Sequence, residues 1–316
     1  MKRRIPIFFA SDDNYLPYLA VAIRSISDNG SDDNIYDVKV LTGGISEEGE
    51  RALCSMKLPR VEIEIVNVEV AMANHRDDLN KRLRDYYSES IFYRIFIASM
   101  YPELDRAIYL DCDIVLIDDV AKLYDEELDG CILGAVADES IPGVPEFVRY
   151  VEGWIGIEVE KYINSGILLI DLAQFRAARI EETITELAAA YNFDTVAPDQ
   201  DYLNFLCSGR IKYLPLSWNK QPKADNVIPV EKLHLIHYNM FNKPWHYRKV
   251  PYSGEFWKYA ERTPFYERIR RELEGYGKAE RIRDKKGAVI LLANAERLSH
   301  TEYGFASLSK KAVVGK

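Results

Sequence analysis

The chain has 316 residues, of which 47% are hydrophobic and 29% charged, a composition typical of globular rather than disordered proteins. No stretch approaches the roughly 18 consecutive apolar residues that a transmembrane helix needs, and the 4 cysteines form no C-x-x-C pair that would indicate a zinc site or a disulfide framework. The net charge of −9 argues against nucleic-acid binding by the main body of the chain. We therefore expect a cytoplasmic protein that binds no nucleic acid.

Short apolar runs alternate with segments of helical periodicity through the first two hundred residues. Five runs are expected as buried strands: Ile5–Ala10, Asp37–Thr42, Val61–Val68, Arg106–Leu110 and Cys131–Ala137. Apolar residues recur every three or four positions in three intervening segments, as they do in helices: Leu16–Ser27, Ser46–Met56 and Ser90–Met100. This alternation predicts an α/β fold with a mainly parallel central sheet flanked by helices.

The pattern loosens after residue 140. We expect strands at Gly166–Leu172 and, late in the chain, at Leu233–His237. Helices are expected at Glu181–Tyr191, from about Pro198, and at Pro264–Glu274, of which the last is amphipathic. The last stretch, from about Lys278, contains one apolar run (Ala288–Leu292) and then becomes polar. We divide the chain into a catalytic domain, residues 1–245, and a basic, aromatic-rich region, residues 246–316, that is partly helical and packs on the domain.

Two aspartates stand in an unusually apolar setting. The segment Asp111-Cys112-Asp113 ends the run Ala107–Leu110, and carboxylates among apolar residues are costly unless they are paired or bind a metal. Residues i and i+2 of an extended chain point to the same side, so both carboxylates could reach one divalent cation and, through it, a diphosphate. The alternative is that the pair forms a turn or caps a helix at Asp118–Tyr124.

Other polar residues have equally open roles. A neutral His237 would complete a metal site, and Lys243, six residues later, would suit a phosphate, but an ordinary hydrogen-bonded strand histidine is the alternative. Arg94 lies in an apolar segment and therefore needs an anionic partner, either a structural carboxylate or a ligand. Helix capping is the competing interpretation for four further segments: Ala10–Tyr15, Asp138, Asn164–Gly166 and Asp199–Gln200.

Taken together, these segments resemble glycosyltransferase family 8, the retaining family that includes bacterial lipopolysaccharide galactosyltransferases and glucosyltransferases, and glycogenin. The resemblance runs from Ile5 to about Trp245, with a looser similarity to Glu274. It rests on the order and spacing of seven short motifs: Phe9-Ala-Ser-Asp-Asp-Asn-Tyr15, Tyr93-Arg94, Tyr109-Leu-Asp-Cys-Asp113, Gly134-Ala-Val-Ala-Asp138, Asn164-Ser-Gly166, Asp199-Gln-Asp201, and His237-Tyr238 with Lys243-Pro-Trp245.

The resemblance implies a GT-A fold and a set of site residues. It implies that Asp111, Asp113 and His237 hold Mn²⁺, with Mg²⁺ as an alternative, against the diphosphate of a UDP-sugar, and that Lys243 contacts the diphosphate. Uridine and ribose would be bound by Ala10, Asp12, Asn14 and Tyr15. The donor sugar would be surrounded by Arg94, Asp138, Asn164, Asp199 and Gln200, with Cys112 and Ser165 in the same nucleotide-sugar set.

The implied activity is retaining transfer of galactose or glucose from the UDP-sugar to a glycan or glycolipid acceptor of the cell envelope. We expect the acceptor to attack on the face that the diphosphate leaves, while Gln200 stabilises the developing positive charge. A covalent intermediate on Gln200 or Asp199 is the alternative, although a carboxamide is a poor nucleophile. Some relatives have a glycine where this chain has Met240, which puts one close backbone approach to the phosphates in doubt.

Other functions stay open at this point. They are a catalytically inactive sugar-nucleotide or glycan-binding module, a sugar nucleotidyltransferase, and a self-glucosylating primer of the glycogenin kind. The nucleotidyltransferase would normally show a glycine-rich loop after the first strand, whereas this chain has no glycine before Gly30.

The C-terminal region is basic, with 17 Lys and Arg against 9 Asp and Glu in residues 243–316. Its aromatic residues either complete the core or, with the basic residues of 243–286, hold the protein against the inner face of an anionic membrane that carries the acceptor. These aromatic residues are Trp245, Tyr247, Tyr252, Phe256, Trp257, Tyr259, Phe265 and Tyr266. Assembly into a homo-oligomer is left open.

Overall fold

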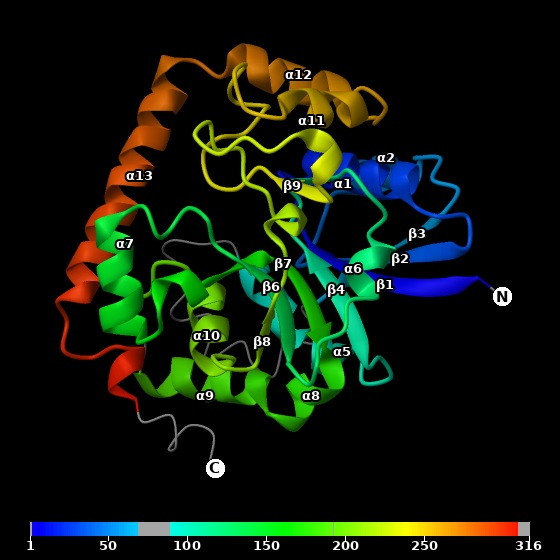
Figure 1. Ribbon diagram of the computed structural model, residues 1–316. Helices are drawn as coiled ribbons and strands as arrows, with labels where there is room; N and C mark the ends of the chain where they lie inside the picture. The colour runs from blue at the N-terminus through cyan, green and yellow to red at the C-terminus, as the bar shows by residue number, and fades with distance from the viewer. Residues whose placement is uncertain (1, 69–88, 192, 309–316) are drawn as a thin grey trace.

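The centre of the fold is a seven-stranded sheet with the order β3-β2-β1-β4-β7-β6-β8 (Figure 1). The structure is a computed structural model that describes residues 2–68, 89–191 and 193–308. Four neighbouring pairs in the sheet are parallel, and β7 is antiparallel to both β4 and β6, which confirms the predicted mainly parallel sheet. The strands are β1 (Arg3–Ala10), β2 (Asn34–Thr42), β3 (Val61–Asn67), β4 (Arg106–Leu110), β6 (Leu133–Ala137), β7 (Ile163–Asp171) and β8 (Ile211–Tyr213).

Helices cover both faces of this sheet, because successive side chains of a strand point to opposite faces. Ile7 and Phe9 of β1 belong to one buried cluster, and Phe8 between them belongs to the other. The first cluster is covered by α1 (Leu16–Asn29), α2 (Glu47–Cys54), α11 (Ser253–Ala260) and α12 (Tyr266–Gly275). The second is covered by α5 (Ile97–Met100), α7 (Pro145–Arg149), α8 (Leu172–Ala177), α9 (Ile180–Tyr191) and α10 (Pro198–Leu206).

A smaller two-stranded sheet lies beside the main one. It pairs β5 (Ile114–Leu116) with β9 (Leu235–His237) in antiparallel register, and a short helix, α6 (Ala121–Tyr124), follows β5. The sequence predicted β9 but not β5, because a strand of three residues leaves too short a pattern to recognise.

Two predicted segments differ in the structure. The helix expected at Ser90–Met100 is mostly a 3₁₀ helix, residues 89–96, and only α5 is α-helical, in keeping with a run of aromatic and β-branched residues that lose rotamer freedom in an α-helix. The second is α13 (Lys278–Ser299), a single helix that we had expected only as a short apolar run. It runs along one side of the molecule from α12 to α7 (Figure 1).

The eight aromatic residues between Trp245 and Tyr266 that the sequence singled out complete the core. Trp245, Phe256, Tyr259 and Phe265 are buried in the cluster that contains α1, and the other four are partly buried against it. Among the described residues, every helix is too short or too polar to traverse a bilayer. Residues 309–316 of the expected C-terminal region lie outside the described residues.

Candidate active site

The antiparallel pairing of β4 with β7 builds the first half of the site. Asp111 directly follows β4, and Asn164, Ser165 and Gly166 stand at the beginning of β7, so the two groups lie at the same edge of the sheet. The backbone N–H of Asp111 donates to the carbonyl of Gly166 at 2.7 Å. The sequence predicted a strand that starts at Gly166, whereas β7 begins earlier, at Ile163, and includes all three residues.

The small sheet supplies the second half. Ile114 pairs with His237 across β5 and β9, and the N–H of Tyr238 donates to the carbonyl of Asp113 at 2.8 Å. This pairing brings a histidine from far along the chain next to the two aspartates. The carboxylates and the imidazole form one group whose ligand atoms all lie within 4.8 Å of one another.

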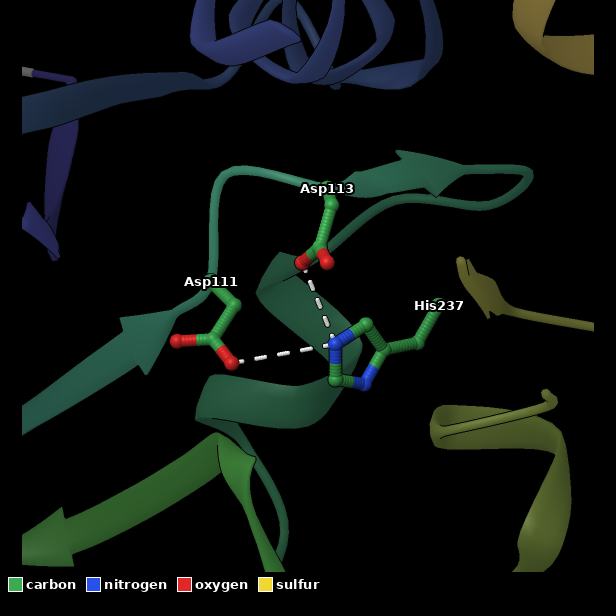
Figure 2. A group of neighbouring side chains, drawn as sticks. All are labelled: Asp111, Asp113 and His237. Carbon is green, nitrogen blue, oxygen red and sulfur yellow. Dashed lines mark ion pairs between the residues drawn. The ribbon is translucent and has the colours of Figure 1, made fainter. Parts of the chain in front are cut away.

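Figure 2 shows that the Nε2 atom of His237 points between the two carboxylates. It lies 3.2 Å from Oδ1 of Asp113 and 3.7 Å from Oδ2 of Asp111. This nitrogen is buried and has no hydrogen-bond partner among the described residues. The remaining question is whether it carries a proton or a lone pair.

The other ring nitrogen, Nδ1, contacts the side chain of Asn219. Its amide nitrogen donates to Oδ1 of Asn164 at 3.0 Å, so its oxygen faces His237, 2.9 Å from Nδ1. An amide oxygen only accepts hydrogen bonds, so Nδ1 carries a proton, and it is Nε2 that offers a lone pair in the neutral imidazole. Two carboxylates and one imidazole lone pair that converge in this way fit a divalent cation, and a hydrogen bond that fixes the ligating tautomer is the usual support for such a histidine.

Gly166 makes this convergence sterically feasible. A Cβ atom at this position would lie 2.5 Å from both Oδ2 of Asp111 and Cε1 of His237. Any side chain would therefore collide with two of the three residues, and only glycine lets the β7 backbone approach this closely.

A buried ion pair adjoins the group. The ammonium of Lys243 contacts Oδ2 of Asp113, and both side chains are buried. Burial alone would raise the pKa of Asp113, but the ammonium of Lys243 holds that pKa well below its ordinary value. The carboxylate is consequently ionised at neutral pH.

Arg94 links the metal-ligand group to the residues around it. Its guanidinium contacts Oδ1 of Asp111 and Oδ2 of Asp199, each at 3.1 Å, and donates to the carbonyl of Ser165 at 2.6 Å. It also lies over the ring of Tyr109, 4.2 Å from the centroid. Burial lowers the pKa of Arg94, but Asp199, Tyr109 and Asp111 more than offset this and raise it above its ordinary value. Arg94 thus has the structural carboxylate partners that the sequence left open.

The first turn of α10 supplies two further predicted residues. Oδ2 of Asp199 accepts a hydrogen bond from the hydroxyl of Ser165 at 2.9 Å, and Oε1 of Gln200 accepts one from the N–H of Ser165 at 2.9 Å. Burial raises the pKa of Asp199, although Arg94 opposes the effect. Ser165 therefore fixes both α10 side chains against β7.

The carboxylate of Asp138 accepts hydrogen bonds from three side chains. Oδ2 accepts from the Asn164 side chain at 3.0 Å, and Oδ1 accepts from Gln221 at 2.9 Å and from the Ser140 hydroxyl at 2.6 Å. All of its neighbours donate, so the carboxylate is held in one orientation.

The loop after β1 lies at the same edge of the sheet but makes separate contacts. Oδ1 of Asp12 accepts from the backbone N–H groups of Asn14 and Tyr15, each at 3.0 Å, which is the capping role that the sequence left open. Asn14 and Tyr15 are exposed, and the thiol of Cys112 contacts the carbonyl of Ala10 at 3.1 Å. Their contacts with a nucleotide remain a prediction.

A cavity of about 420 Å³ adjoins the metal-ligand group, a size within the usual range for small-molecule sites. Asp111 belongs to both. Its lining includes most of the predicted sugar-binding residues together with a group of apolar residues. The polar residues include Arg94, Asp138, Asn164, Ser165, Asp199 and Gln200, and the apolar residues include Ile141, Phe147, Met240, Phe241 and Leu291.

Met240 occupies the position at which the sequence departs from some relatives. Its backbone has φ of 59°, in the left-handed region that favours glycine. The chain therefore keeps the conformation that a glycine would adopt, but it adds a side chain that is 43% exposed and lines the cavity.

Sequence reasoning missed several residues that support the site. Asn219 and Gln221 belong to a polar run that follows Trp218, and that run between apolar segments was the available signal. Ser140 and Gly287 carried no signal at all. Their positions depend on how distant segments pack.

Comparisons with known proteins identify the family of this chain. The family model described as Glycosyl transferase family 8 matches residues 6–249. General stress protein A of Bacillus subtilis (strain 168) is 26% identical over 277 residues, which cover 81% of this chain and 93% of that protein. The lipopolysaccharide 1,2-glucosyltransferase of Escherichia coli (strain K12) is 27% identical over 192 residues, 57% of this chain and 56% of that protein.

A solved structure is similar over most of the chain. It is the galactosyltransferase LgtC in complex with donor and acceptor sugar analogs, with a TM-score of 0.65, 26% identity, and coverage of 82% of this chain and 96% of that chain. Both the predicted GT-A fold and the predicted family are thereby confirmed. With the family model matching more than half of its length, the chain belongs to glycosyltransferase family 8.

Proposed function

We propose that this glycosyltransferase moves galactose or glucose from a UDP-sugar to a glycan or glycolipid acceptor, with retention of anomeric configuration. Asp111, Asp113 and His237 would hold Mn²⁺. The observation that carries the proposal is the unpartnered Nε2 atom of His237, buried between two carboxylates beside a cavity with polar lining residues.

The donor atoms suit this choice of cation. Carboxylates favour Mg²⁺, Ca²⁺ and Mn²⁺, and an imidazole in the set favours a transition metal, so Mn²⁺ fits better than Mg²⁺. Bound there, the cation would neutralise the diphosphate and so stabilise the departing UDP. The side chains of this protein would bind the donor sugar and stabilise the charge that develops during the reaction.

Lys243 and Arg94 would supply fixed positive charge near the leaving group. Lys243 is buried beside Asp113, and Arg94 is buried between Asp111 and Asp199. Their orientation is set before any ligand arrives, so little reorganisation accompanies the buildup of charge on the leaving diphosphate. Asp138 and Asn164 would bind and orient the hydroxyls of the donor sugar.

Retention is better explained by attack on the leaving-group face than by a covalent intermediate. Asp199 is already engaged by Arg94 and by the hydroxyl of Ser165, which reduces its availability as a nucleophile. Gln200 presents a carboxamide, a weak nucleophile whose oxygen can still stabilise positive charge at the anomeric carbon. A phosphate oxygen of the leaving group would then take the proton of the acceptor hydroxyl.

Two relatives favour a hexose donor and a saccharide acceptor. One is named a lipopolysaccharide glucosyltransferase, and another is a galactosyltransferase solved with donor and acceptor sugar analogs. A role in cell-envelope polysaccharide synthesis is the corresponding proposal for this chain.

A panel of nucleotide sugars tests the proposal. We expect UDP-galactose or UDP-glucose to raise the Tm in the presence of Mn²⁺ and to be slowly hydrolysed, with both effects abolished by EDTA. ADP- and GDP-sugars should have no effect. Stabilisation without hydrolysis or transfer would favour an inactive binding module, formation of UDP-sugar from UTP and a sugar phosphate would favour a nucleotidyltransferase, and indifference to every UDP-sugar would overturn the proposal.

We also propose peripheral contact with an anionic membrane through residues 243–286. Because the aromatic residues of this region pack in the core, the support comes from the first half of α13, where Arg281, Ile282, Arg283, Lys285 and Lys286 are all exposed. A basic helical face with an exposed apolar residue is typical of surface-binding helices. Co-sedimentation with anionic vesicles at low salt tests this, and the absence of binding would contradict it.

A further inference from the structure

Helix α13 is anchored at both ends and crosses one side of the cavity between the anchors. Near its start, Asp284 accepts hydrogen bonds from the hydroxyls of Tyr247, at 2.5 Å, and Tyr276, at 2.8 Å. Near its end, Glu296 accepts from Arg149 of α7 at 3.0 and 2.5 Å, and Ala295 and Leu298 are buried. In Figure 1 this helix connects the region of α12 with that of α7.

The middle of α13 faces the cavity. Gly287 and Leu291, one turn apart and therefore on the same side of the helix, both line it. A Cβ atom at Gly287 would lie 3.2 Å from the ring of Phe241, which follows β9. Glycine weakens a helix interior relative to alanine, and at this point it lets the ring of Phe241 pack directly against the backbone of α13.

Five of the residues that line the cavity offer almost no hydrogen bonds. Ile141, Phe147, Phe241 and Leu291 have no polar side-chain atoms, and Met240 has only a thioether. Tyr150 and Tyr162 also line the cavity, but their hydroxyls donate to the buried carboxylate of Asp201 at 2.8 and 2.6 Å. Their rings therefore add to the apolar surface.

From this contrast we infer that the middle of α13 forms one wall of an acceptor subsite that takes an apolar aglycone attached to the acceptor sugar. Gly287 lets the ring of Phe241 lie against the helix in this wall, and Leu291 contacts the aglycone. The inference rests on the proposed function, because it assumes that a donor sugar lies against the polar residues of the cavity. An acceptor held against the apolar residues would then present its hydroxyl to that sugar.

Binding of simple glycosides to the Mn²⁺- and UDP-loaded protein tests the inference. The probes are p-nitrophenyl and methyl β-glucosides and β-galactosides, measured by isothermal titration. Burial of an aryl group should make a p-nitrophenyl glycoside bind about tenfold more tightly than the matching methyl glycoside. Gly287→Leu, whose side chain must displace the ring of Phe241 or enter the cavity, should remove this preference. Ala293→Leu, which adds the same side chain on the exposed face of α13, should retain it.

Leu291→Ala provides a second test that does not crowd the helix. Loss of an apolar contact should weaken binding of the p-nitrophenyl glycosides about fivefold and leave that of the methyl glycosides unchanged. Equal affinity of aryl and methyl glycosides for the unaltered protein, or identical behaviour of the Gly287→Leu and Ala293→Leu variants, would overturn the inference. The Tm with and without UDP and Mn²⁺ tests the proposed function separately from the inference. If UDP and Mn²⁺ do not raise the Tm of the unaltered protein, the proposed function fails and the inference fails with it.

Discussion

The side-chain oxygen of Asn219 lies 2.9 Å from Nδ1 of His237, and this contact determines what the histidine can do. It fixes the proton on Nδ1 and directs the Nε2 lone pair toward Asp111 and Asp113. The polarity of Asn219 is itself fixed, because its amide nitrogen donates to Asn164.

Replacing Asn219 with alanine should therefore weaken metal binding without removing a ligand. We expect Mn²⁺ affinity to fall about 10- to 100-fold, the usual range for loss of a hydrogen bond that orients a ligating histidine. The measurement is the Mn²⁺ concentration that half-saturates the UDP-induced rise in Tm. Asn226→Ala, at an exposed loop position, is the matched control and should leave that concentration unchanged. An unchanged value for Asn219→Ala would mean that His237 is not a ligand.

The substitution Asp113→Asn should abolish turnover while the protein stays folded. The carboxamide keeps the shape of the side chain but loses the charge that Lys243 and a cation both need. We expect at least a 100-fold loss of UDP-sugar hydrolysis, a cooperative unfolding transition, and no difference in Tm with and without Mn²⁺ in the presence of UDP. Near-normal hydrolysis with Mn²⁺ present would refute the assignment of the metal site. Asp118→Asn, in the helix-capping region that follows, provides the comparison.

The local sequence pattern was sufficient to predict the strand that precedes Asp111, but not the distant residues that complete the site. β4 occupies the predicted Arg106–Leu110, and Asp111 follows it as expected, because a short buried run ended by charged residues has few other structural solutions. The third ligand could be placed only through the family resemblance, since nothing local in the sequence connects His237 with β5. The family spacing carried that information.

The C-terminal third shows where sequence reasoning stops. α13 is 22 residues long, but Gly287 interrupts its pattern and its first half is almost entirely polar, so only Ala288–Leu292 was recognisable as a regular segment. Its position across the cavity depends on contacts with distant residues. Asp284 contacts Tyr247, more than thirty positions away, and Glu296 contacts Arg149, more than a hundred positions away. Such long-range packing leaves no trace in a single window of sequence.

Gln200→Ala should lower the rate strongly without weakening UDP binding. Gln200 faces the cavity from α10 and bonds to the backbone of Ser165, away from the Asp113–Lys243 pair. We expect kcat for UDP-sugar hydrolysis to fall about 100-fold or more, while the Kd for UDP with Mn²⁺ stays within about twofold. A parallel loss of UDP affinity would instead make Gln200 a binding residue.

Arg94→Lys should destabilise the protein although the charge is kept. Arg94 contacts Asp111, Asp199 and Ser165 at once, and a single ammonium cannot reproduce this planar fork. Leaving buried carboxylates incompletely paired should cost about 2–4 kcal/mol of unfolding free energy, measured by urea denaturation. Arg51→Lys, at an exposed ion pair with Glu47, should change it by less than about 0.5 kcal/mol. Equal effects of the two substitutions would rule out a structural role for the Arg94 network.

Glu181→Gln should make stability less dependent on pH. Burial at the start of α9 raises the pKa of Glu181 from the ordinary 4.5 to about 7, with the negative charge of Glu182 adding to the effect and the Ser99 hydroxyl, 3.0 Å away, opposing it. A carboxyl whose pKa is raised by folding stabilises the folded state at low pH, where it is protonated, and this contribution is lost as the pH rises through the folded pKa.

Between pH 5 and pH 8 the unaltered protein should therefore lose about 1–3 kcal/mol of unfolding free energy relative to the Gln variant, which keeps a side chain of the same shape and does not titrate. Urea denaturation at both pH values measures the difference, and Glu186→Gln, at an exposed position of the same helix, should show no such gain. An unfolding free energy of Glu181→Gln that follows that of the unaltered protein at both pH values would show that Glu181 stays ionised throughout this range.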